Sequence, residues 1–413
     1  MSLDKAITFL RNNGDEIINF ASKLISIPSV NPPGDMTEIA SFIKDYLGSW
    51  GLDVKWIEPK KGKITLLSSI GDGDELLMLN GHMDVVPPGD VNKWKHPPFS
   101  GKIVGEYLYG RGASDMKGPL ASMIFAYIAF AQNFSNLDHK VSFSIVPDEE
   151  TGGQYGVGYL VEVMKLKPKY VLIGEPSTIY VANIGEKGIL WLRFRVDGKP
   201  GHASLSPYVG QNAIVKAMDV IKEIYELTKV NFEPPQDIKE TAVKSGEIVA
   251  KTTKNRELRR IFYSLSCNVG VIKGGVKVNV VAPYCEFDVD LRIPHGASTN
   301  DIINLVKNQV ASKFNVKFEV VAKEEPNYTS PKSKLLEKLS IAAKEELNVE
   351  ITPTLITGAT DGRYFRCVGS DVIIYGPADW LGIHGYDEKV RVDELKAASR
   401  IYLRAISYLV KDS

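Results

Sequence analysis

The run Leu76-Leu77-Met78-Leu79-Asn80-Gly81-His82-Met83-Asp84 decides the fold of this 413-residue chain. Four consecutive apolar residues that lead into Asn, Gly and His are typical of a buried strand that ends in a polar turn. Similar strand patterns alternate with helical patterns along the chain, at 4–25 and 36–50 (helices), 64–69 (strand), 117–133 (helix), 140–146 (strand), 155–165 (helix) and 169–174 (strand). This alternation predicts an α/β domain whose mixed, largely parallel sheet is flanked by helices.

The pattern changes between residues 184 and 324. Strand patterns and helical patterns are there arranged in a new order, at 189–196 (strand), 209–227 (helix), 264–273 and 284–292 (strands), 298–313 (helix) and 316–322 (strand). We therefore expect an α+β domain at 184–324, inserted between two segments of the α/β domain, 1–183 and 325–413. A stretch rich in Lys and Glu, 231–260, is interpreted as a mobile surface excursion without a catalytic role.

Composition excludes several classes of protein. Lys plus Arg and Asp plus Glu both number 50, so the formal net charge is zero and no broad basic face for nucleic acid is expected. The first thirty residues lack the apolar segment of a signal peptide, and no apolar run approaches the roughly 20 residues that span a bilayer. Three scattered cysteines support neither a disulfide framework nor a thiolate zinc site. We expect a soluble, cytoplasmic protein that binds neither nucleic acid nor membrane.

His82 is placed by the strand pattern at the carboxyl end of its strand, where open α/β sheets bind ligands. A metal-ligating imidazole usually donates its other N–H to a carboxylate or carbonyl, and Asp84, two residues on, suits that role. Taken alone, the two residues are equally compatible with a structural strand-end histidine beside an aspartate in a turn.

Carboxylates recur at the following strand ends. Asp115 precedes the helical pattern 117–133, where it could instead cap the helix. Glu149 and Glu150 follow the strand 140–146, in a loop that could simply be solvated, and Glu175 follows the strand 169–174. Histidine and carboxylate ligands without thiolates suit Zn²⁺, Co²⁺ or Mn²⁺, and these carboxylates are too many for one ion. Two ions about 3.5–4 Å apart, bridged by one carboxylate, would use them all.

Six motifs in this order resemble the M20 metallopeptidase and aminoacylase family, which includes acetylornithine deacetylase and succinyl-diaminopimelate desuccinylase. The motifs extend over almost the whole chain: Gly81-His82-Met83-Asp84, Gly110-Arg111-Gly112-Ala113-Ser114-Asp115-Met116-Lys117-Gly118, Asp148-Glu149-Glu150, Gly174-Glu175-Pro176, Gly201-His202-Ala203-Ser204 and a late His384.

The resemblance implies a complete ligand set for two divalent ions, with zinc favoured and cobalt or manganese as alternatives. Asp115 would bridge the ions, His82 and Glu175 would complete one site, and Glu150 and His384 would complete the other. Because His384 follows the inserted domain and must return to this site, both chain ends would belong to one catalytic domain.

The resemblance also implies which carboxylates act without binding metal. Glu149 would remain unligated and act as the general base, and Asp84 would support His82. His202 would stabilise the oxyanion of the tetrahedral intermediate, in similar enzymes often in the neighbouring subunit. Asn279 and Arg292 would hold the substrate carboxylate, for which the planar guanidinium of arginine is suited.

Without the resemblance, a loop histidine is the preferred interpretation of His202, and a surface ion pair is the alternative for Arg292. The loop Gly358-Ala359-Thr360-Asp361-Gly362-Arg363 resembles a substrate loop near the metals. The three other histidines match no ligand motif and are predicted to lie at the surface: His96, His139 and His295.

The expected function is hydrolysis of the amide bond of an N-acyl amino acid, with the inserted domain forming the surface of a homodimer. An exopeptidase, either carboxypeptidase or dipeptidase, that acts on a short peptide is the alternative within the same chemistry. A non-catalytic metal-binding homologue is the second alternative, although Glu149 and all five ligands are present.

Overall fold

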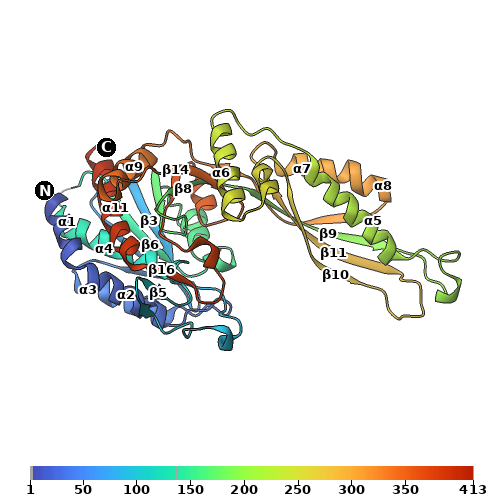
Figure 1. Ribbon diagram of the computed structural model, residues 1–413, viewed down its shortest axis with the longest axis horizontal. Coiled ribbons are helices and arrows are strands. Elements are labelled where there is room, and N and C mark those ends of the chain that lie inside the picture. The colour runs from blue at the N-terminus through green and yellow to red at the C-terminus, as the bar shows by residue number, and fades with distance from the viewer. Residues whose placement is uncertain (1–2, 135–136, 413) are drawn as a thin grey trace. The chain divides into compact units, whose positions relative to one another are not determined.

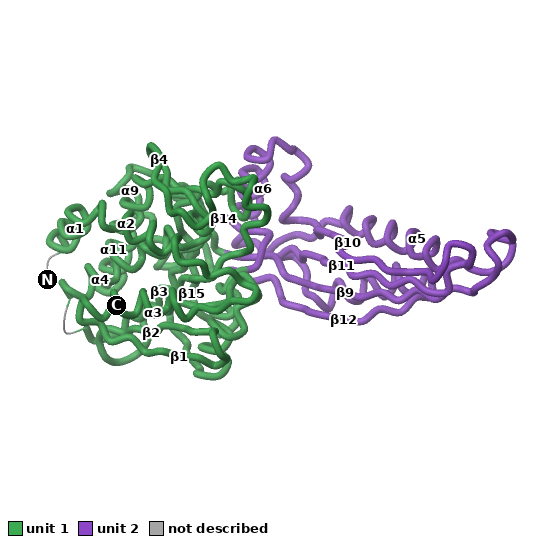
Figure 2. Tube along the Cα trace, turned by 90° about the horizontal axis from the view of Figure 1, so that it is seen from below, with its two compact units in different colours: residues 1–184, 329–353, 360–413 green, residues 185–328, 354–359 purple. Residues whose placement is uncertain are grey.

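The computed structural model describes residues 3–134 and 137–412 (Figure 1). Two compact units divide the chain (Figure 2): unit 1 contains 1–184, 329–353 and 360–413, and unit 2 contains 185–328 and 354–359. The chain thus leaves unit 1 after Ile184 and re-enters it at Thr329, and a short second excursion at 354–359 had no counterpart in the sequence pattern. No helix in the described ranges is long and apolar enough to cross a membrane.

A mixed sheet is the framework of unit 1, and the predicted mixed α/β class is confirmed. In the described part of the chain its strands follow the order β1-β2-β6-β3-β7-β15-β8-β13, with β14 also paired to β8. The central strands β6, β3, β7 and β15 pair in parallel, and the pairs β1–β2, β2–β6, β15–β8 and β8–β13 on either side of them are antiparallel. The strands are β1 Lys55–Lys60, β2 Lys63–Ile70, β3 Glu75–His82, β6 Lys140–Val146, β7 Tyr170–Ile173, β8 Val181–Glu186, β13 Asn327–Tyr328, β14 Thr352–Ile356 and β15 Asp371–Ile374.

Helices cover both faces of this sheet because alternate strand residues are apolar on either side. One face packs against the π-helical turn Tyr159–Val163 and α10 (Gly362–Cys367), through a core that includes Met78, Val171 and Phe365. The other helices of unit 1 are α1 Leu3–Asn12, α2 Gly14–Ser26, α3 Thr37–Ser49, α4 Lys117–Asn133, α9 Lys334–Leu347 and α11 Val392–Lys411. A small sheet, β16-β5-β4, completes the unit, with β4 Lys102–Val104, β5 Tyr107–Tyr109 and β16 Lys389–Arg391.

Of two helical predictions for unit 1, one differs from the structure and one agrees with it. The single helix expected over 4–25 is two helices, which meet at Asn13. By contrast, α4 begins and ends where its pattern predicted, and its residues from Lys117 to Phe130 are all buried. A helix that is apolar on all sides belongs inside a core, and here it supports the loop that carries Asp115.

Unit 2 is an antiparallel sheet with helices. Its strands follow the order β10-β11-β9-β12, with β9 Gly188–Asp197, β10 Ser266–Gly274, β11 Tyr284–Ile293 and β12 Lys317–Glu324. Helices α5 (Ala213–Glu226) and α7 (Thr299–Val306) share one apolar core with the inward-facing strand residues. The stretch 231–260, interpreted as a surface excursion, is mostly exposed, but it contains the regular helix α6 (Lys239–Thr252), which buries Ala242, Ser245 and Gly246. Small residues rather than large apolar ones form that buried face, so the hydrophobic period is weak.

The parallel centre of the sheet gathers the ends of three strands. His82, the last residue of β3, pairs with Val146 at the end of β6, and Asn80 pairs with Ile173 at the end of β7. Because parallel strands end at the same edge, the loops after β3, β6 and β7 begin side by side.

Candidate metal centre

His82 is buried at the end of β3 and is held from one side. Its Nδ1 lies 2.9 Å from the carbonyl oxygen of Asp84 and 3.4 Å from that residue's Oδ1. The Asp84 carboxylate in turn accepts a 2.8 Å hydrogen bond from Asn31 Nδ2. The ring is therefore fixed through Nδ1, which leaves Nε2 directed at Asp115, whose Oδ1 is 3.0 Å away.

Asp115 lies between two imidazoles. Its second oxygen, Oδ2, is 3.2 Å from Nε2 of His384, and the same Nε2 is 3.2 Å from Oε2 of Glu150. The two oxygens of one carboxylate thus face two different nitrogen donors, His82 and His384. Such a carboxylate is placed as a bridging ligand would be.

Two groups of donor atoms converge at this edge of the sheet. His82, Asp115 and Glu150 form one group, and His82, Glu149 and Glu175 form the other; within each group the donor atoms lie within 4.8 Å of one another. His384 joins through Asp115 and Glu150. Nitrogen and carboxylate oxygen donors without sulfur are the set that Zn²⁺, Co²⁺ and Mn²⁺ accept, so the residues fit divalent cations.

Electrostatics separate the carboxylates of this cluster. Burial opposes ionisation of Asp115, but the hydrogen bonds to His384 and His82 outweigh it and hold the pKa of Asp115 well below its ordinary value. Burial, reinforced by the neighbouring charge of Glu175, raises the pKa of Glu149 well above its ordinary value. Asp115 and Glu149, two carboxylates of one cluster, therefore differ sharply in basicity, as acid–base chemistry requires.

Two of the predicted substrate residues lie together in unit 2. The backbone N–H of Ala203, next to His202, donates to the carbonyl oxygen of Asn279 at 3.2 Å, and His202 forms a bridge with Val280. Both His202 and Asn279 are exposed. The imidazole Nδ1 of His202 is 2.7 Å from Ser204 Oγ, so Nε2 is the nitrogen left for a ligand.

Arg292 lies at the other end of β11 from these residues. It pairs with Ile189 at the start of β9, whereas Tyr284, which follows the Asn279 loop, pairs with Asp197. At roughly 3.3 Å per residue the strand between them spans on the order of 25 Å. Within one chain, Arg292 and Asn279 therefore cannot hold the same small carboxylate. The Arg292 guanidinium is 3.0 Å from Asp290, and one-quarter of its side chain is exposed.

Among the remaining histidines, His96 and His139 are partly exposed, but the prediction for His295 was wrong. His295 is buried, its Nε2 is 3.1 Å from the carbonyl oxygen of Asn327, and its ring packs edge-on against Tyr328. The Pro and Gly that flank His295 suggested a surface turn, and only the pairing of distant segments buries it.

Sequence reasoning assigned no role to several buried polar residues around the donors. Asp361 is 1% exposed, and neither of its carboxylate oxygens has a hydrogen-bond partner among the described residues. It lies against the loop after β6, since a Cβ added to Gly153 would come 2.2 Å from Asp361 Oδ1. Burial raises the pKa of Asp361 to about 7. Arg111 and Glu388 were also missed, although both stand inside quoted motifs or next to them.

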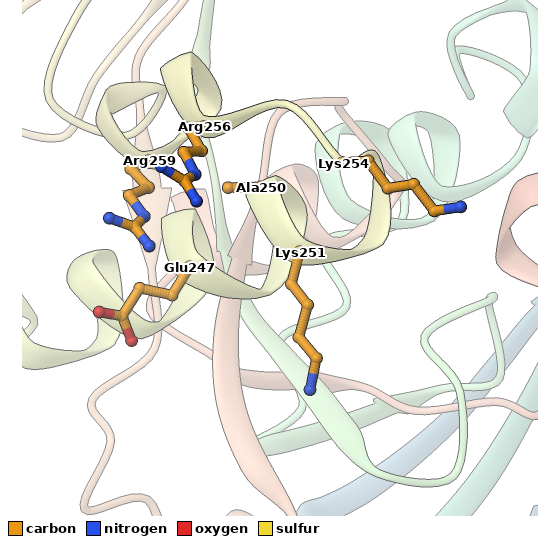
Figure 3. Close-up of a pocket in the computed structure, with 6 residues that line it drawn as sticks. All are labelled: Glu247, Ala250, Lys251, Lys254, Arg256 and Arg259. Carbon is orange, nitrogen blue, oxygen red and sulfur yellow. The ribbon is translucent and has the colours of Figure 1, made fainter.

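A surface hollow in unit 2 is lined by Glu247, Ala250, Lys251, Lys254, Arg256 and Arg259 (Figure 3). Its basic side chains do not converge: Lys251 and Lys254 point away from Arg256 and Arg259. Six lining residues without histidine offer no metal site of the kind found in unit 1.

Histidines and carboxylates that converge at the carboxyl edge of an α/β sheet are the arrangement of a metal-dependent hydrolase. The chain belongs to peptidase family M20/M25/M40, whose family model matches residues 78–408. Membership makes it a metal-dependent enzyme that acts on amide bonds.

Solved structures of similar fold cover nearly the entire chain. An M20 family metallo-carboxypeptidase from Sulfolobus solfataricus matches with a TM-score of 0.77 and 21% identity, over 96% of this chain and 98% of the other. A di-peptidase from Saccharomyces cerevisiae matches with a TM-score of 0.76 and 17% identity, over 99% of both chains. A dinuclear metal binding peptidase from Bacillus subtilis matches with a TM-score of 0.67 and 14% identity, over 97% and 99%. At these identities the likeness extends to the fold.

Proposed function

We propose that this chain is a two-metal hydrolase that cleaves the amide bond of an N-acyl amino acid. One observation carries the proposal: Glu149 lies beside a ligand set that is complete without it. His82 and Glu175 would bind one ion, and Glu150 and His384 would bind the other. Asp115 would bind both ions. Two bound divalent ions, zinc in the first instance and cobalt or manganese otherwise, would polarise the scissile carbonyl and acidify a water molecule.

Glu149 then has the position of a general base. It shares a donor group with His82 and Glu175, and ligation of the adjacent Glu150 leaves it the free member of the pair. We infer that Glu149 takes a proton from the attacking water and delivers it to the leaving amine. Asp84 keeps the His82 ring oriented throughout, through Nδ1.

The substrate class has two candidates with the same bond chemistry. A dipeptide is itself an N-aminoacyl amino acid, and both the Sulfolobus solfataricus and Saccharomyces cerevisiae proteins are named as peptidases. An exopeptidase is therefore the second candidate beside the deacylase of acetylornithine or succinyl-diaminopimelate type. In either case Arg292 would hold the free carboxylate of the substrate and His202 would stabilise the oxyanion.

We also propose that the chain forms a homodimer through unit 2. Apolar side chains gather near His202 and Asn279, where the loop before α5, the start of α5 and the β10–β11 connection meet. Tyr208 is 94% exposed and Val278 97% exposed, and the α5 residues Val215 and Met218 are about half exposed. Large apolar side chains exposed on neighbouring segments are typical of protein–protein contacts. Assembly of two copies there would explain why Asn279 and Arg292 are so far apart: they would serve sites of different subunits.

The substitution Glu149→Gln tests the mechanism. Loss of the base is expected to lower kcat by about 10²–10⁴-fold, while two metal ions per chain remain bound, because Glu149 is not among the ligands. Metal content is measured by elemental analysis of the same preparation that is assayed. Glu162→Gln, at an exposed glutamate of the neighbouring π-helical turn, is the matched control. Full activity in Glu149→Gln, or in wild-type enzyme stripped by a chelator, contradicts the proposal.

A substrate panel separates the two candidates. Co²⁺- or Zn²⁺-loaded enzyme is assayed against N-acetyl amino acids, acetylornithine, succinyl-diaminopimelate and dipeptides. A kcat/KM at least tenfold higher for an acyl substrate supports the deacylase, and the reverse supports the exopeptidase.

A further inference from the structure

A buried ion pair stands next to the donor cluster and supplies none of its ligands. Arg111 is 2% exposed and Glu388 is fully buried, and Arg111 Nη1 is 2.6 Å from Glu388 Oε2. Removing two charges from water costs several kcal/mol each, which roughly cancels the attraction between them. A buried pair of this kind therefore contributes little to overall stability. Its role is indicated instead by the hydrogen bonds that it forms with the surrounding residues.

Glu388 holds the loop that presents Asp115. Its Oε1 accepts hydrogen bonds from the backbone N–H groups of Gly112, Ser114 and Asp115, at 3.1, 3.0 and 3.0 Å. Three donors on one carboxylate oxygen fix the path of the loop just before α4. The position of the Asp115 side chain follows from that path.

Arg111 holds the segment that presents His384. Its Nη2 donates to the carbonyl oxygen of His384 at 3.1 Å, and its guanidinium lies 5.2 Å from the centre of the Trp94 ring. The positive φ of His384, +61°, shows that the backbone there departs from the common conformations of a non-glycine residue. The hydrogen bond from Arg111 to this carbonyl keeps the His384 imidazole directed at Asp115 and Glu150.

We propose that the Arg111–Glu388 pair is a positioning device that sets Asp115 and His384 at the separation needed to hold the second metal ion. The inference rests on the proposed function, which assigns these residues as ligands. Asp115 and His384 are 269 positions apart in the numbering, and the pair joins their two segments directly. In the described ranges, the hydrogen bonds of Arg111 and Glu388 do not involve His82 or Glu175. The metal site of His82 and Glu175 would therefore depend on the Arg111–Glu388 pair only through Asp115.

The test measures Co²⁺ binding to the metal-free chain, both by calorimetry and by visible absorption. Glu388→Gln keeps an oxygen for the loop amides but removes the charge that faces Arg111. Arg111→Lys keeps the charge but removes the planar fork whose two nitrogens bond Glu388 and the His384 carbonyl. In both variants we expect the Co²⁺ affinity of the second binding step to fall by about 10–100-fold, as it does for other residues that orient ligands. The affinity of the first step should fall by a severalfold smaller factor. Raising Co²⁺ should restore turnover in Arg111→Lys, but not in Glu149→Gln.

Glu346→Gln is the matched control. It removes the charge from another buried glutamate, which pairs with Arg400 and Arg404 between α9 and α11 and bonds none of the donors. It should bind two Co²⁺ ions as the wild type does. If Glu388→Gln fails to fold, Arg111→Lys decides the question. Unchanged second-step affinity in a folded variant overturns the positioning role, whereas a wild-type chain that binds only one ion overturns the proposed metal centre instead.

Discussion

His82 shows how a single proposed ligand depends on the residues that surround it. Its Nδ1 is held by the carbonyl and carboxylate of Asp84, and Asp84 is held by Asn31. Lys63 Nζ donates in turn to Asn31 Oδ1 at 2.9 Å. A chain of buried polar contacts therefore leads from β2 to the donor atom, and each link fixes the next.

Replacing Asp84 by Ala should weaken metal binding without removing a ligand. The backbone carbonyl at position 84 still accepts from His82, so we expect the mild end of the effect of such residues, about 10-fold in affinity for the first Co²⁺ ion. Calorimetric titration of the metal-free chain measures it. Asp74→Ala, at an exposed aspartate just before β3, serves as control. Equal affinity in Asp84→Ala and the wild type would exclude an orienting role.

Among the helices, α9 and α11 are joined by an ion pair that is mostly buried. Glu346 is 4% exposed, and its oxygens lie 2.8 Å from Arg400 Nε and 2.6 Å from Arg404 Nε. Burial alone would raise the pKa of Glu346, but the hydrogen bonds to Arg400 and Arg404 outweigh it, and its pKa is lowered. A carboxyl whose pKa falls on folding stabilises the folded chain in its ionised form.

Stability at this helix pair should therefore depend on pH. The contribution of Glu346 is fully present above the ordinary glutamate pKa of about 4.3 and is lost as the pH falls through the lower folded value. Glu346→Gln should cost about 1–3 kcal/mol of unfolding free energy at pH 7, because two arginines lose their charged partner. Urea unfolding of both proteins between about pH 7 and about pH 3 measures the difference. It should begin to shrink only below about pH 4.3, and a difference that grows with acid would contradict the assignment.

For the molecule as a whole, unit 2 interrupts unit 1 in sequence and carries its own core. His384 follows the insertion in sequence but belongs to unit 1, so the candidate metal centre is built from both ends of the chain. His202 and Asn279 belong to unit 2, next to its exposed apolar residues. The proposed dimer gives that surface a partner.

Disrupting the proposed dimer should yield monomers with low activity. Met218→Asp places a charge among the exposed apolar residues of α5, and analytical ultracentrifugation should then find a monomer where the wild type is a dimer. We expect kcat to fall about as far as in His202→Ala, since His202 would lose access to the partner's substrate. Val163→Asp, at an exposed apolar residue of unit 1, should leave the mass and the activity unchanged. A monomeric wild type would refute this assembly.

Local patterns in the sequence were sufficient for the mixed α/β class and for the placement of most donors at strand ends. Apolar runs such as Leu76–Leu79, followed by a polar turn, report on burial and direction over a few residues, and parallel strands bring their carboxyl ends together. They failed where the signal was weak or discontinuous, as in α6, whose buried face is made of small residues.

Contacts between distant segments were decided by the tertiary structure alone. Glu388 is 273 residues from the Asp115 amide that it binds, His295 is buried by Asn327, and β11 separates Arg292 from Asn279. No periodicity encodes such contacts, because each depends on where the completed sheets place two segments that are independent in sequence. The residue types of the proposed ligands can be recognised in the sequence, but the distances that bring their donor atoms together arise only on folding.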